Sequence, residues 1–220
     1  MIADRIHTLR QTLPKHVRLI AVTKQVTADR MREAYHAGIR DFGENRLQEA
    51  EAKYAQLQDL TDVTWHFIGR LQRNKARRVL DLFSWIHSVD SLSIAQRLNQ
   101  LAQSCDCPPQ ICLQVKLLPD ANKGGWSVDE LLSALPALDQ CEHLRIQGLM
   151  AIPPLGLSAD QVLAYFQQLR DLATTINQLA FPRLTLTQLS MGMSDDYPLA
   201  VQAGATIVRL GRTIFGDRPL

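Results

Sequence analysis

Short apolar segments alternate with longer amphipathic segments along all 220 residues, and this alternation constrains the fold more than any other feature. Most short segments are apolar without strict alternation, which is typical of parallel strands covered on both faces. The longer segments repeat apolar residues at the three-to-four-residue spacing of helices. The sequence predicts eight strands, at residues 18–23, 39–43, 64–68, 85–89, 111–116, 145–150, 185–189 and 205–210.

The helical segments complete this pattern. Segment 158–179 places its apolar residues on one face and opens with Ser158 and Gln161, the spacing of a capping box. An additional helix, at about residues 2–13, precedes the first strand. Eight strand–helix alternations predict an α/β fold, a (β/α)8 TIM barrel forming a single domain over residues 1–220. The alternative is an open doubly wound sheet, although no strand is followed by the GxGxxG of its dinucleotide-binding version.

Composition excludes several classes of protein. The net charge of +2 gives no strong bias toward nucleic acid or anionic membranes. The N-terminus has no continuous apolar core of a signal peptide, and no apolar run approaches the ~18 residues of a membrane span. The four cysteines form no CxxC pair and have no histidine at metal-ligand spacing, so we expect reduced thiols and no metal. The sequence therefore predicts a cytoplasmic protein that binds neither nucleic acid nor membrane.

Polar residues follow the predicted strands where a barrel places its ligands. In a (β/α)8 barrel the functional site lies at the C-terminal ends of the strands. Lys24 follows the first strand, Asn45 follows the second and His66 lies within the third. A lysine amine in a partly desolvated pocket loses its proton more easily and becomes a nucleophile.

The loops after the seventh and eighth strands have the composition of a phosphate site. Barrels usually bind phosphate at these two loops. Ser190 offers a hydroxyl, and Gly192 and Gly211 allow backbone amides to approach an anion closely. Ser194 is suited to cap a following helix, whose free amides would face the same place. The two aspartates that come next would repel a phosphate, so we expect them to point away.

Arg209 lies inside the apolar segment ATIVRLG, where a buried guanidinium needs a partner. That partner is either a structural ion pair or a ligand acceptor. A lysine, a phosphate cradle and an arginine suit pyridoxal 5'-phosphate (PLP), which carries an aldehyde, a phosphate and a ring nitrogen. They also suit a Schiff-base aldolase acting on a sugar phosphate, so the residues alone leave both open.

Six segments extend the pattern to a known family: AVTK, GENRLQE, HFIGRLQRNK, GLMAI, LSMGMSDDYPLA and VRLGRTIFG. In this order, and over nearly the whole chain, they closely resemble the pyridoxal-phosphate homeostasis protein family. That family is similar to the barrel domain of alanine racemase. The resemblance implies a PLP-binding protein that stores, buffers or delivers the cofactor and so affects amino-acid and keto-acid balance. It implies PLP-dependent apoenzymes as recipients, a monomeric chain and no catalytic residue.

The resemblance also implies roles for individual residues. Lys24 would carry PLP as an internal aldimine, a covalent Schiff base. The resemblance places Asn45 and His66 on the face of the cofactor, with Met150 packing nearby, and Arg209 at the pyridine nitrogen. It places Ser190 at the phosphate, together with backbone amides around Gly192, Gly211 and Arg212. Ser194 would be a further member of the site. The segment VKLLPDANKGGW departs from the family pattern, so Lys123 is expected to be an exposed loop lysine. The other histidines are interpreted as surface or helix-packing residues: His7, His16, His36, His87 and His143.

A cation at the ring nitrogen argues against an enzyme. It disfavours protonation of the pyridine, which makes the ring a weaker electron sink than an aspartate partner does. The related racemase takes its second base, a tyrosine, from an extra domain of the partner subunit, for which the predicted single domain has no counterpart. The four tyrosines are expected in helices or at a helix start, with Tyr197 the nearest candidate base. The competing interpretations are a one-domain amino-acid racemase and a Schiff-base aldolase.

Overall fold

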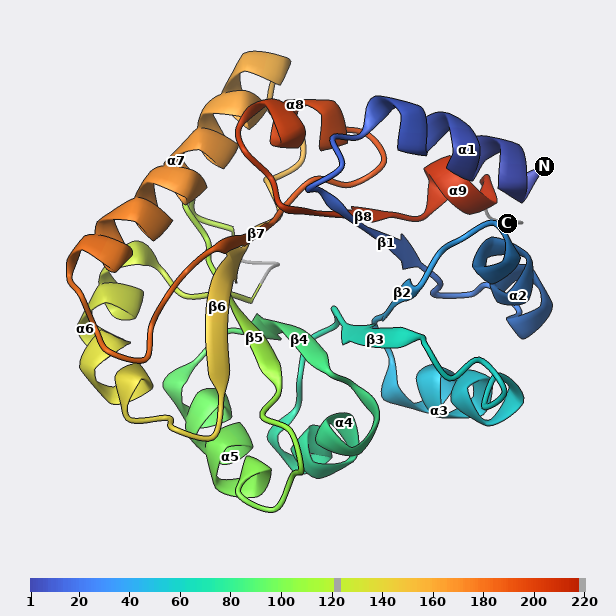
Figure 1. The fold of residues 1–220 in the computed structure, drawn as a ribbon. Coiled ribbons are helices and arrows are strands. Elements are labelled where there is room, and N and C mark those ends of the chain that lie inside the picture. Colours follow the sequence, from blue (N-terminus) through green and yellow to red (C-terminus); the bar gives the residue numbers. More distant parts are fainter. Residues whose placement is uncertain (121–123, 218–220) are drawn as a thin grey trace.

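The computed structural model describes residues 1–120 and 124–217, and within them eight parallel strands close into a barrel (Figure 1). The strands follow one another around the barrel in chain order, and β8 closes onto β1. They are β1 Arg18–Val22, β2 Asp41–Glu44, β3 Thr64–Phe67, β4 Trp85–Val89, β5 Gln110–Gln114, β6 Arg145–Met150, β7 Gln188–Ser190 and β8 Ile207–Leu210. The predicted (β/α)8 barrel is confirmed, and the open doubly wound sheet is excluded.

Helices form a ring around the strands (Figure 1). They are α1 Ile2–Thr12, α2 Ala28–His36, α3 Leu47–Gln56, α4 Ala76–Leu82, α5 Leu92–Ala102, α6 Val128–Asp139, α7 Ala159–Gln178, α8 Tyr197–Gln202 and α9 Arg212–Phe215, with a short 3-10 helix, η1 Arg73–Lys75, before α4. The additional N-terminal helix is confirmed as α1, which packs against α2 and α9. No helix in the described part of the chain combines the length and the apolar character needed to cross a membrane.

Reciprocal capping explains where two of the helices begin. The amide of Gln161 donates to the Ser158 hydroxyl, and the amide of Ser158 donates to the Gln161 side chain. Ser127 and Glu130 form the same pair at the start of α6. Each capping box satisfies amides that have no partner within the first turn of a helix. These boundaries are therefore determined locally by the sequence.

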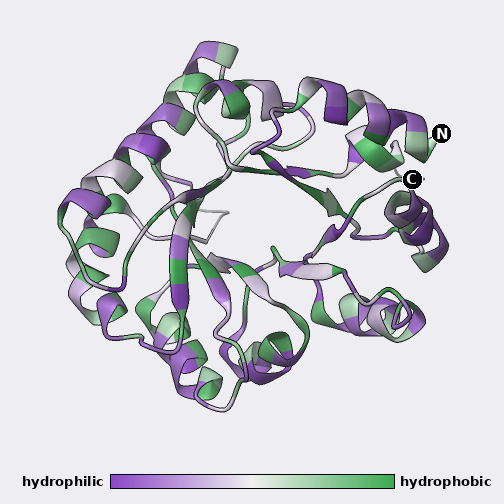
Figure 2. Cartoon of the chain, in the orientation of Figure 1, coloured by the Kyte–Doolittle hydropathy of each residue, from purple (hydrophilic) through white to green (hydrophobic). Residues whose placement is uncertain are grey.

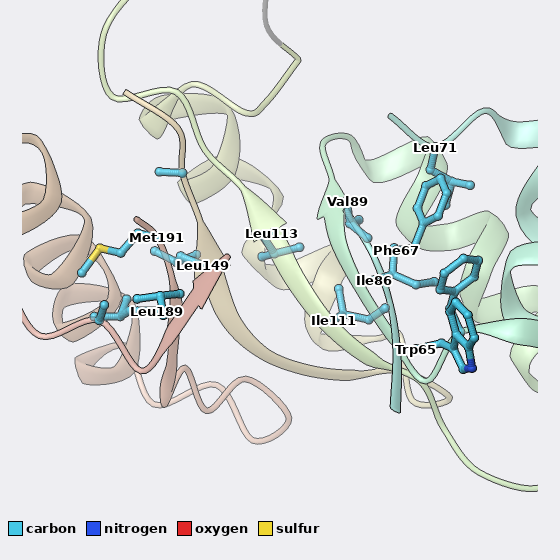
Figure 3. Packing of buried hydrophobic residues seen from close by; sticks show 14 of the residues in the cluster. Trp65, Phe67, Leu71, Ile86, Val89, Ile111, Leu113, Leu149, Leu189 and Met191 are labelled. Carbon is cyan, nitrogen blue, oxygen red and sulfur yellow. The ribbon is translucent and has the colours of Figure 1, made fainter. Parts of the chain in front are cut away.

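Hydrophobic side chains fill two separate regions. The larger lies between the strands and the helix ring, where Trp65, Phe67, Leu149 and Leu189 belong to one continuous cluster (Figure 3). Figure 2 shows hydrophobic and hydrophilic residues mixed along the helices of the ring, as expected for helices with one covered face. The smaller cluster is separate and consists of Ile20, Trp85, Cys112, Met150 and Ile207. Because neighbouring residues of a strand face opposite ways, the barrel interior receives every second side chain.

Candidate functional site

Lys24 lies in the turn that leads out of β1, at the C-terminal end of the barrel, and its side chain is half-buried. The amide of Val26 donates to the carbonyl of Thr23 at 2.9 Å, which closes a four-residue turn around Lys24 and Gln25. Gln25 has a φ of 61°. For residues other than glycine this left-handed conformation costs about 1–2 kcal/mol, so the turn needs support from its surroundings.

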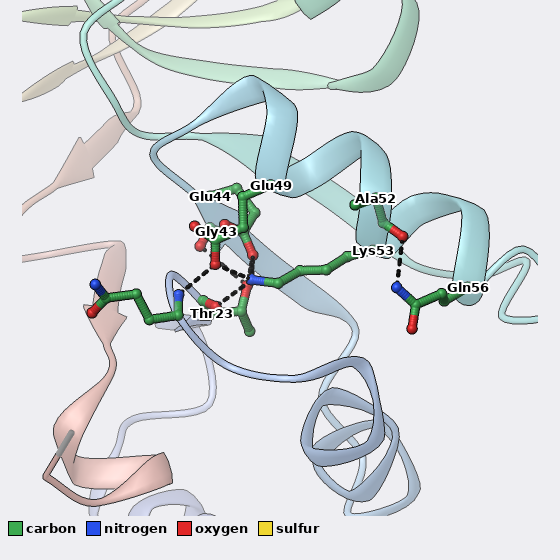
Figure 4. Close-up of polar contacts among 8 residues, drawn as sticks. Thr23, Gly43, Glu44, Glu49, Ala52, Lys53 and Gln56 are labelled. Atoms are coloured by element: carbon green, nitrogen blue, oxygen red, sulfur yellow. Dashed lines mark hydrogen bonds and ion pairs between the residues drawn. The ribbon is translucent and has the colours of Figure 1, made fainter. Parts of the chain in front are cut away.

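A buried charged cluster supplies that support (Figure 4). Lys53 of α3 is 6% exposed, and its ammonium donates to Glu44 Oε1 at 2.7 Å and Glu49 Oε1 at 2.6 Å. The same ammonium donates to the Thr23 carbonyl at 2.6 Å. The Thr23 hydroxyl donates to Glu44 Oε1 at 2.6 Å, and the Gln25 amide donates to Glu49. The cluster thus joins β2 and α3 to the turn that carries Lys24.

The two carboxyl groups of the cluster differ in their affinity for protons. Burial raises the pKa of Glu44, although hydrogen bonds from Lys53 and Thr23 partly oppose this effect. For Glu49, partial burial acts to raise the pKa, but hydrogen bonds from Lys53 and from the Gln25 amide outweigh it and lower the pKa. A proton taken up by the cluster therefore goes to Glu44 before Glu49.

Asn45 follows β2, beside the Lys24 turn. Its Oδ1 is buried and receives no hydrogen bond from any described residue. Gly69, after β3, lies so close to it that a Cβ on Gly69 would be 2.0 Å from the Asn45 carbonyl oxygen. A buried acceptor without a donor costs about 1–3 kcal/mol and is rare in native proteins. Asn45 Oδ1 is therefore an unsatisfied hydrogen-bond acceptor next to the turn that carries Lys24.

A chain of polar side chains crosses the barrel interior. Asp41 Oδ1 lies 2.9 Å from His66 Nε2, and His66 Nδ1 lies 3.0 Å from His87 Nε2. His87 Nδ1 lies 2.8 Å from Ser190 Oγ, and Arg209 donates to the same Oγ at 2.7 Å. This chain of hydrogen-bonded side chains links the strands β2, β3, β4, β7 and β8.

The two ends of this polar chain determine which atoms carry hydrogen. An arginine only donates, and a carboxylate only accepts. Ser190 therefore accepts from Arg209 and donates to His87. His87 in turn donates to His66, and His66 donates to the Asp41 carboxylate. Every link is satisfied with both imidazoles neutral, which agrees with burial lowering the pKa of His66 and placing that of His87 well below its ordinary value.

The two buried histidines predict a loss of stability in acid. The pKa of His66 and of His87 lies below 6.5 in the folded protein, so below about pH 6.5 the unfolded chain binds more protons than the folded one. We expect the free energy of unfolding to fall as the pH drops below about 6.5, by up to about 1.4 kcal/mol per pH unit for each histidine. Urea unfolding between pH 7.5 and 5 measures this slope. A His143→Gln variant, which retains both buried histidines, should keep the slope, and a flat profile would contradict the prediction.

Arg209 is a buried cation whose hydrogen-bond partners are neutral. It is 4% exposed and donates to the Ser190 carbonyl at 2.6 Å and to the Ala151 carbonyl at 3.3 Å. Burial lowers its pKa to about 10, so it remains charged near neutral pH. Burial also raises the pKa of the Cys112 thiol to about 12, so this thiol supplies no negative charge. No ion pair of Arg209 is found within the described residues, although the nearby charge of Asp196 acts to raise the pKa of the guanidinium.

The loops after β7 and β8 meet at Ser194. The prediction that Ser194 caps the next helix is wrong, because the N-cap of α8 is Asp196. The Ser194 hydroxyl instead accepts from the amide of Thr213, at the start of α9, at 3.3 Å. Gly192 has a φ of 92°, and a Cβ there would lie 2.6 Å from the Cβ of Ala200. The glycine is thus required by its backbone conformation and by the close packing of α8.

The β8 loop lies beside the end of β1. A Cβ on Gly211 would be 3.4 Å from the carbonyl oxygen of Val22, two residues before Lys24. Arg212 is exposed and forms an ion pair with Asp195, which engages that carboxylate at the surface. Rim residues from the first and last strands are therefore neighbours, although they are far apart in the sequence.

Three of the predicted site residues, Ser190, His66 and Met150, lie on strands and are buried. Ser190 is fully buried, with its hydroxyl bonded to His87 and Arg209, and His66 is enclosed on β3. Met150 pairs in register with Ser190 within the barrel. The prediction that His87 is a surface or helix-packing residue is wrong, because it is 0% exposed and lies on β4 within this polar chain. Lys123 lies outside the described residues.

No group of three histidine, cysteine, aspartate or glutamate side chains in the described ranges could hold a metal ion.

A sequence profile of the alanine racemase N-terminal domain matches residues 1–219. The chain is 54% identical to the pyridoxal phosphate homeostasis protein of Synechocystis sp. over 94% of each chain. The chain belongs to the pyridoxal phosphate homeostasis protein family. It is also 44% identical to the Pseudomonas aeruginosa member, over 99% of this chain and 93% of that one.

Solved structures of similar sequence have the same barrel. PipY of Synechococcus elongatus PCC7942 without PLP superposes with a TM-score of 0.95 at 53% identity, covering 98% of this chain and 100% of PipY. The structure of PipY with PLP bound gives a TM-score of 0.94 at 52% identity, with the same coverage. An alanine racemase of Clostridium difficile 630 shares only the fold, with a TM-score of 0.72 at 14% identity. All of this chain matches 57% of that racemase.

The candidate residues of this chain fall into two groups. The rim group follows the C-terminal ends of the strands, on turns, loops and the first residue of α9, and comprises Lys24, Asn45, Gly192, Ser194, Gly211 and Arg212. The interior group lies on the strands themselves and comprises His66, Met150, Ser190 and Arg209. The sequence analysis did not predict roles for Lys53, Asp41 and His87. Lys53 holds the turn that carries Lys24, and Asp41 and His87 hydrogen-bond within the polar chain of the barrel interior.

Proposed function

We propose that this protein binds PLP at the C-terminal end of its barrel and holds it as a Schiff base on Lys24. The observation that carries the proposal is the buried, unpartnered Oδ1 of Asn45 beside the Lys24 turn. Arg209 adds a buried cation whose hydrogen-bond partners are neutral. A ligand with a ring-nitrogen acceptor and groups able to hydrogen-bond at the rim fits both residues. PipY, at 52% identity, has a structure with PLP bound, which supports this choice of ligand.

The geometry favours a division of roles among the remaining residues. Ser194 and the amides around Gly211 and Arg212 suit the phosphate, because they lie on the two loops that meet beside β1. Ser190 suits a different role from the predicted phosphate ligand, since its hydroxyl already bonds to Arg209 and orients it. The Arg209 guanidinium would then face the ring nitrogen and disfavour its protonation.

We further propose that the protein stores, buffers or delivers PLP and does not turn over amino acids. Its relatives are named homeostasis proteins. The tyrosines that could serve as a second base lie on α2, α3, α7 and α8 and not at strand ends: Tyr35, Tyr54, Tyr165 and Tyr197. A cytoplasmic location, a monomeric state and PLP-dependent apoenzymes as recipients remain predictions.

Loading the purified protein with PLP is expected to produce a visible absorption band that Lys24→Ala lacks. Borohydride reduction followed by peptide mass spectrometry should place the cofactor on Lys24. Lys15→Ala is the matched control, because Lys15 is exposed and lies before β1, whereas Lys24 lies after it. A protein that cannot be loaded, or a band of full intensity in Lys24→Ala, would contradict PLP binding on this lysine.

Chiral analysis tests the carrier role separately. The loaded protein is incubated with L- or D-alanine, and we expect no catalytic turnover. Racemisation over many cycles would replace the carrier role with that of a one-domain racemase and would leave PLP binding intact.

A further inference from the structure

We propose that Glu49 and Lys53 are positioning residues for Lys24, a role that rests on the proposed function. They lie on α3, outside the barrel, and act through the backbone of the turn. The carbonyl of Thr23 belongs to the peptide group before Lys24, and Lys53 donates to it at 2.6 Å. The amide of Gln25 belongs to the peptide group after Lys24, and it donates to Glu49. Side chains of one helix therefore hold both peptide groups that join Lys24 to its neighbours.

The conformation of the turn explains why these contacts are needed. The direction of a side chain follows from the dihedral angles of its own backbone. The turn includes the left-handed Gln25, at a φ of 61°, which a free chain would leave for a more favourable region. The hydrogen bond from the Gln25 amide to Glu49 opposes that change and so keeps the Lys24 side chain directed as it is.

The composition of the cluster argues for positioning over packing. A buried ion pair contributes little net stability compared with an apolar replacement of similar volume. Lys53 is nevertheless buried, and Glu44 and Glu49 both neutralise it. The long side chain of Lys53 reaches from α3 to the Thr23 carbonyl, and Glu49, held by the same ammonium, accepts from the Gln25 amide. The turn contacts therefore account for charged residues at these positions.

Positioning affects the covalent step more than the non-covalent one. In the proposed Schiff base the Lys24 amine replaces the aldehyde oxygen of PLP, which leaves as water. The amine must lie in bonding geometry with the aldehyde carbon, whereas the phosphate and ring can bind without it. Loss of the Glu49 contact should therefore lower the ratio of covalent to non-covalent PLP, while total binding changes less.

Three substitutions of Glu49 distinguish the position of its acceptor oxygen from the negative charge of its carboxylate. Glu49→Gln keeps an acceptor oxygen at the same distance and removes the charge. Glu49→Asp keeps the charge and withdraws the oxygen by one methylene. Glu49→Ala removes both. The matched control is Glu51→Ala, on the same helix, whose carboxylate pairs with Arg78 at the surface and not with the turn.

The measurement compares the visible Schiff-base band with total bound PLP from equilibrium dialysis, at temperatures well below thermal unfolding. We expect the covalent-to-non-covalent ratio to fall about tenfold in Glu49→Ala and Glu49→Asp, the effect of one lost charge-assisted hydrogen bond. Glu49→Gln should stay within about threefold of wild type, and Glu51→Ala should be unchanged.

The outcomes discriminate between the inference and the function on which it rests. Equal ratios in wild type, Glu49→Ala and Glu49→Asp would overturn the positioning role, whatever the shift in melting temperature. A loss in Glu49→Gln with none in Glu49→Asp would also overturn it, because charge and not reach would then matter. A wild-type protein without the Lys24-dependent band would instead overturn the proposed function, and the positioning role with it.

Discussion

Lys53→Met is expected to lower the free energy of unfolding by about 3–5 kcal/mol at pH 7, because it breaks a buried ion pair by removing one partner. Methionine has a similar length and fills the same space between α3 and the barrel, so lost packing contributes little. The cost comes from Glu44, whose carboxylate would remain fully buried without the ammonium that lies 2.7 Å from it. The Thr23 carbonyl would also lose a donor.

The pH dependence of this deficit identifies its cause. The pKa of Glu44 is raised in the folded protein even beside Lys53, and removing the lysine raises it further. A carboxyl whose pKa is higher in the folded state than in the unfolded state favours folding at low pH and loses this effect as the pH rises through its folded pKa. The deficit of Lys53→Met should therefore shrink as the pH falls from 7 toward 5. His66 and His87 act in both proteins, so the difference between variant and wild type reports Glu44 together with Glu49, whose pKa Lys53 lowers.

Urea unfolding of the two proteins at several pH values provides the measurement. Arg78→Met is the control, because it breaks another ion pair of α3, with Glu51, that is exposed to solvent. An exposed pair of this kind contributes about 0–1 kcal/mol. A deficit in Lys53→Met as small as that of the control, or one that grows on acidification, would contradict the prediction.

Gly69→Ala is expected to cost about 3 kcal/mol or more, at the upper end of what overpacking does. The new methyl group would lie 2.0 Å from the carbonyl oxygen of Asn45, and this neighbour is backbone that cannot rotate away. The carbonyl of Gly69 is itself held by the Ser88 hydroxyl, so the loop after β3 resists moving in the opposite direction. Because Asn45 must shift, PLP binding should weaken as well.

Gly156→Ala separates crowding from backbone strain. Nothing lies within 4 Å of a Cβ on Gly156, but its φ of 86° is unfavourable for alanine. That variant should cost only about 1 kcal/mol. Thermal and urea unfolding of both variants give the comparison. Equal costs for the two substitutions would show that the approach of Gly69 to Asn45 is not a tight contact in solution.

Local patterns predicted the barrel well. The strands at 85–89 and 145–150 lie where the apolar segments predicted them. A buried strand can be recognised from its own few residues, because its apolar segment is contiguous in the sequence. At β7 the prediction of 185–189 began three residues early, since the strand is Gln188–Ser190. Residues such as Thr185 and Thr187 favour extended backbone whether or not they pair with a neighbouring strand.

The supporting residues were harder to predict because they depend on closure of the barrel. His87 bonds to Ser190, which lies 103 positions later, and only the closed sheet brings β4 and β7 to the same interior. The role of Lys53 could have been predicted from its position in the helical pattern, although that indication is weaker. It follows Leu47 and Ala50 at helical spacing on the buried side of α3, where a lysine is unusual unless a carboxylate neutralises it.

The polar chain across the barrel interior also constrains how the sequence can change over time. Its carboxylate end and its guanidinium end impose one order of donors and acceptors on Asp41, His66, His87, Ser190 and Arg209. A replacement at any middle position has to accept from one specified neighbour and donate to the other, or a second position must change with it. Drift at these five positions is therefore expected to be concerted, with compensating changes on strands that are distant in the sequence and adjacent in the barrel.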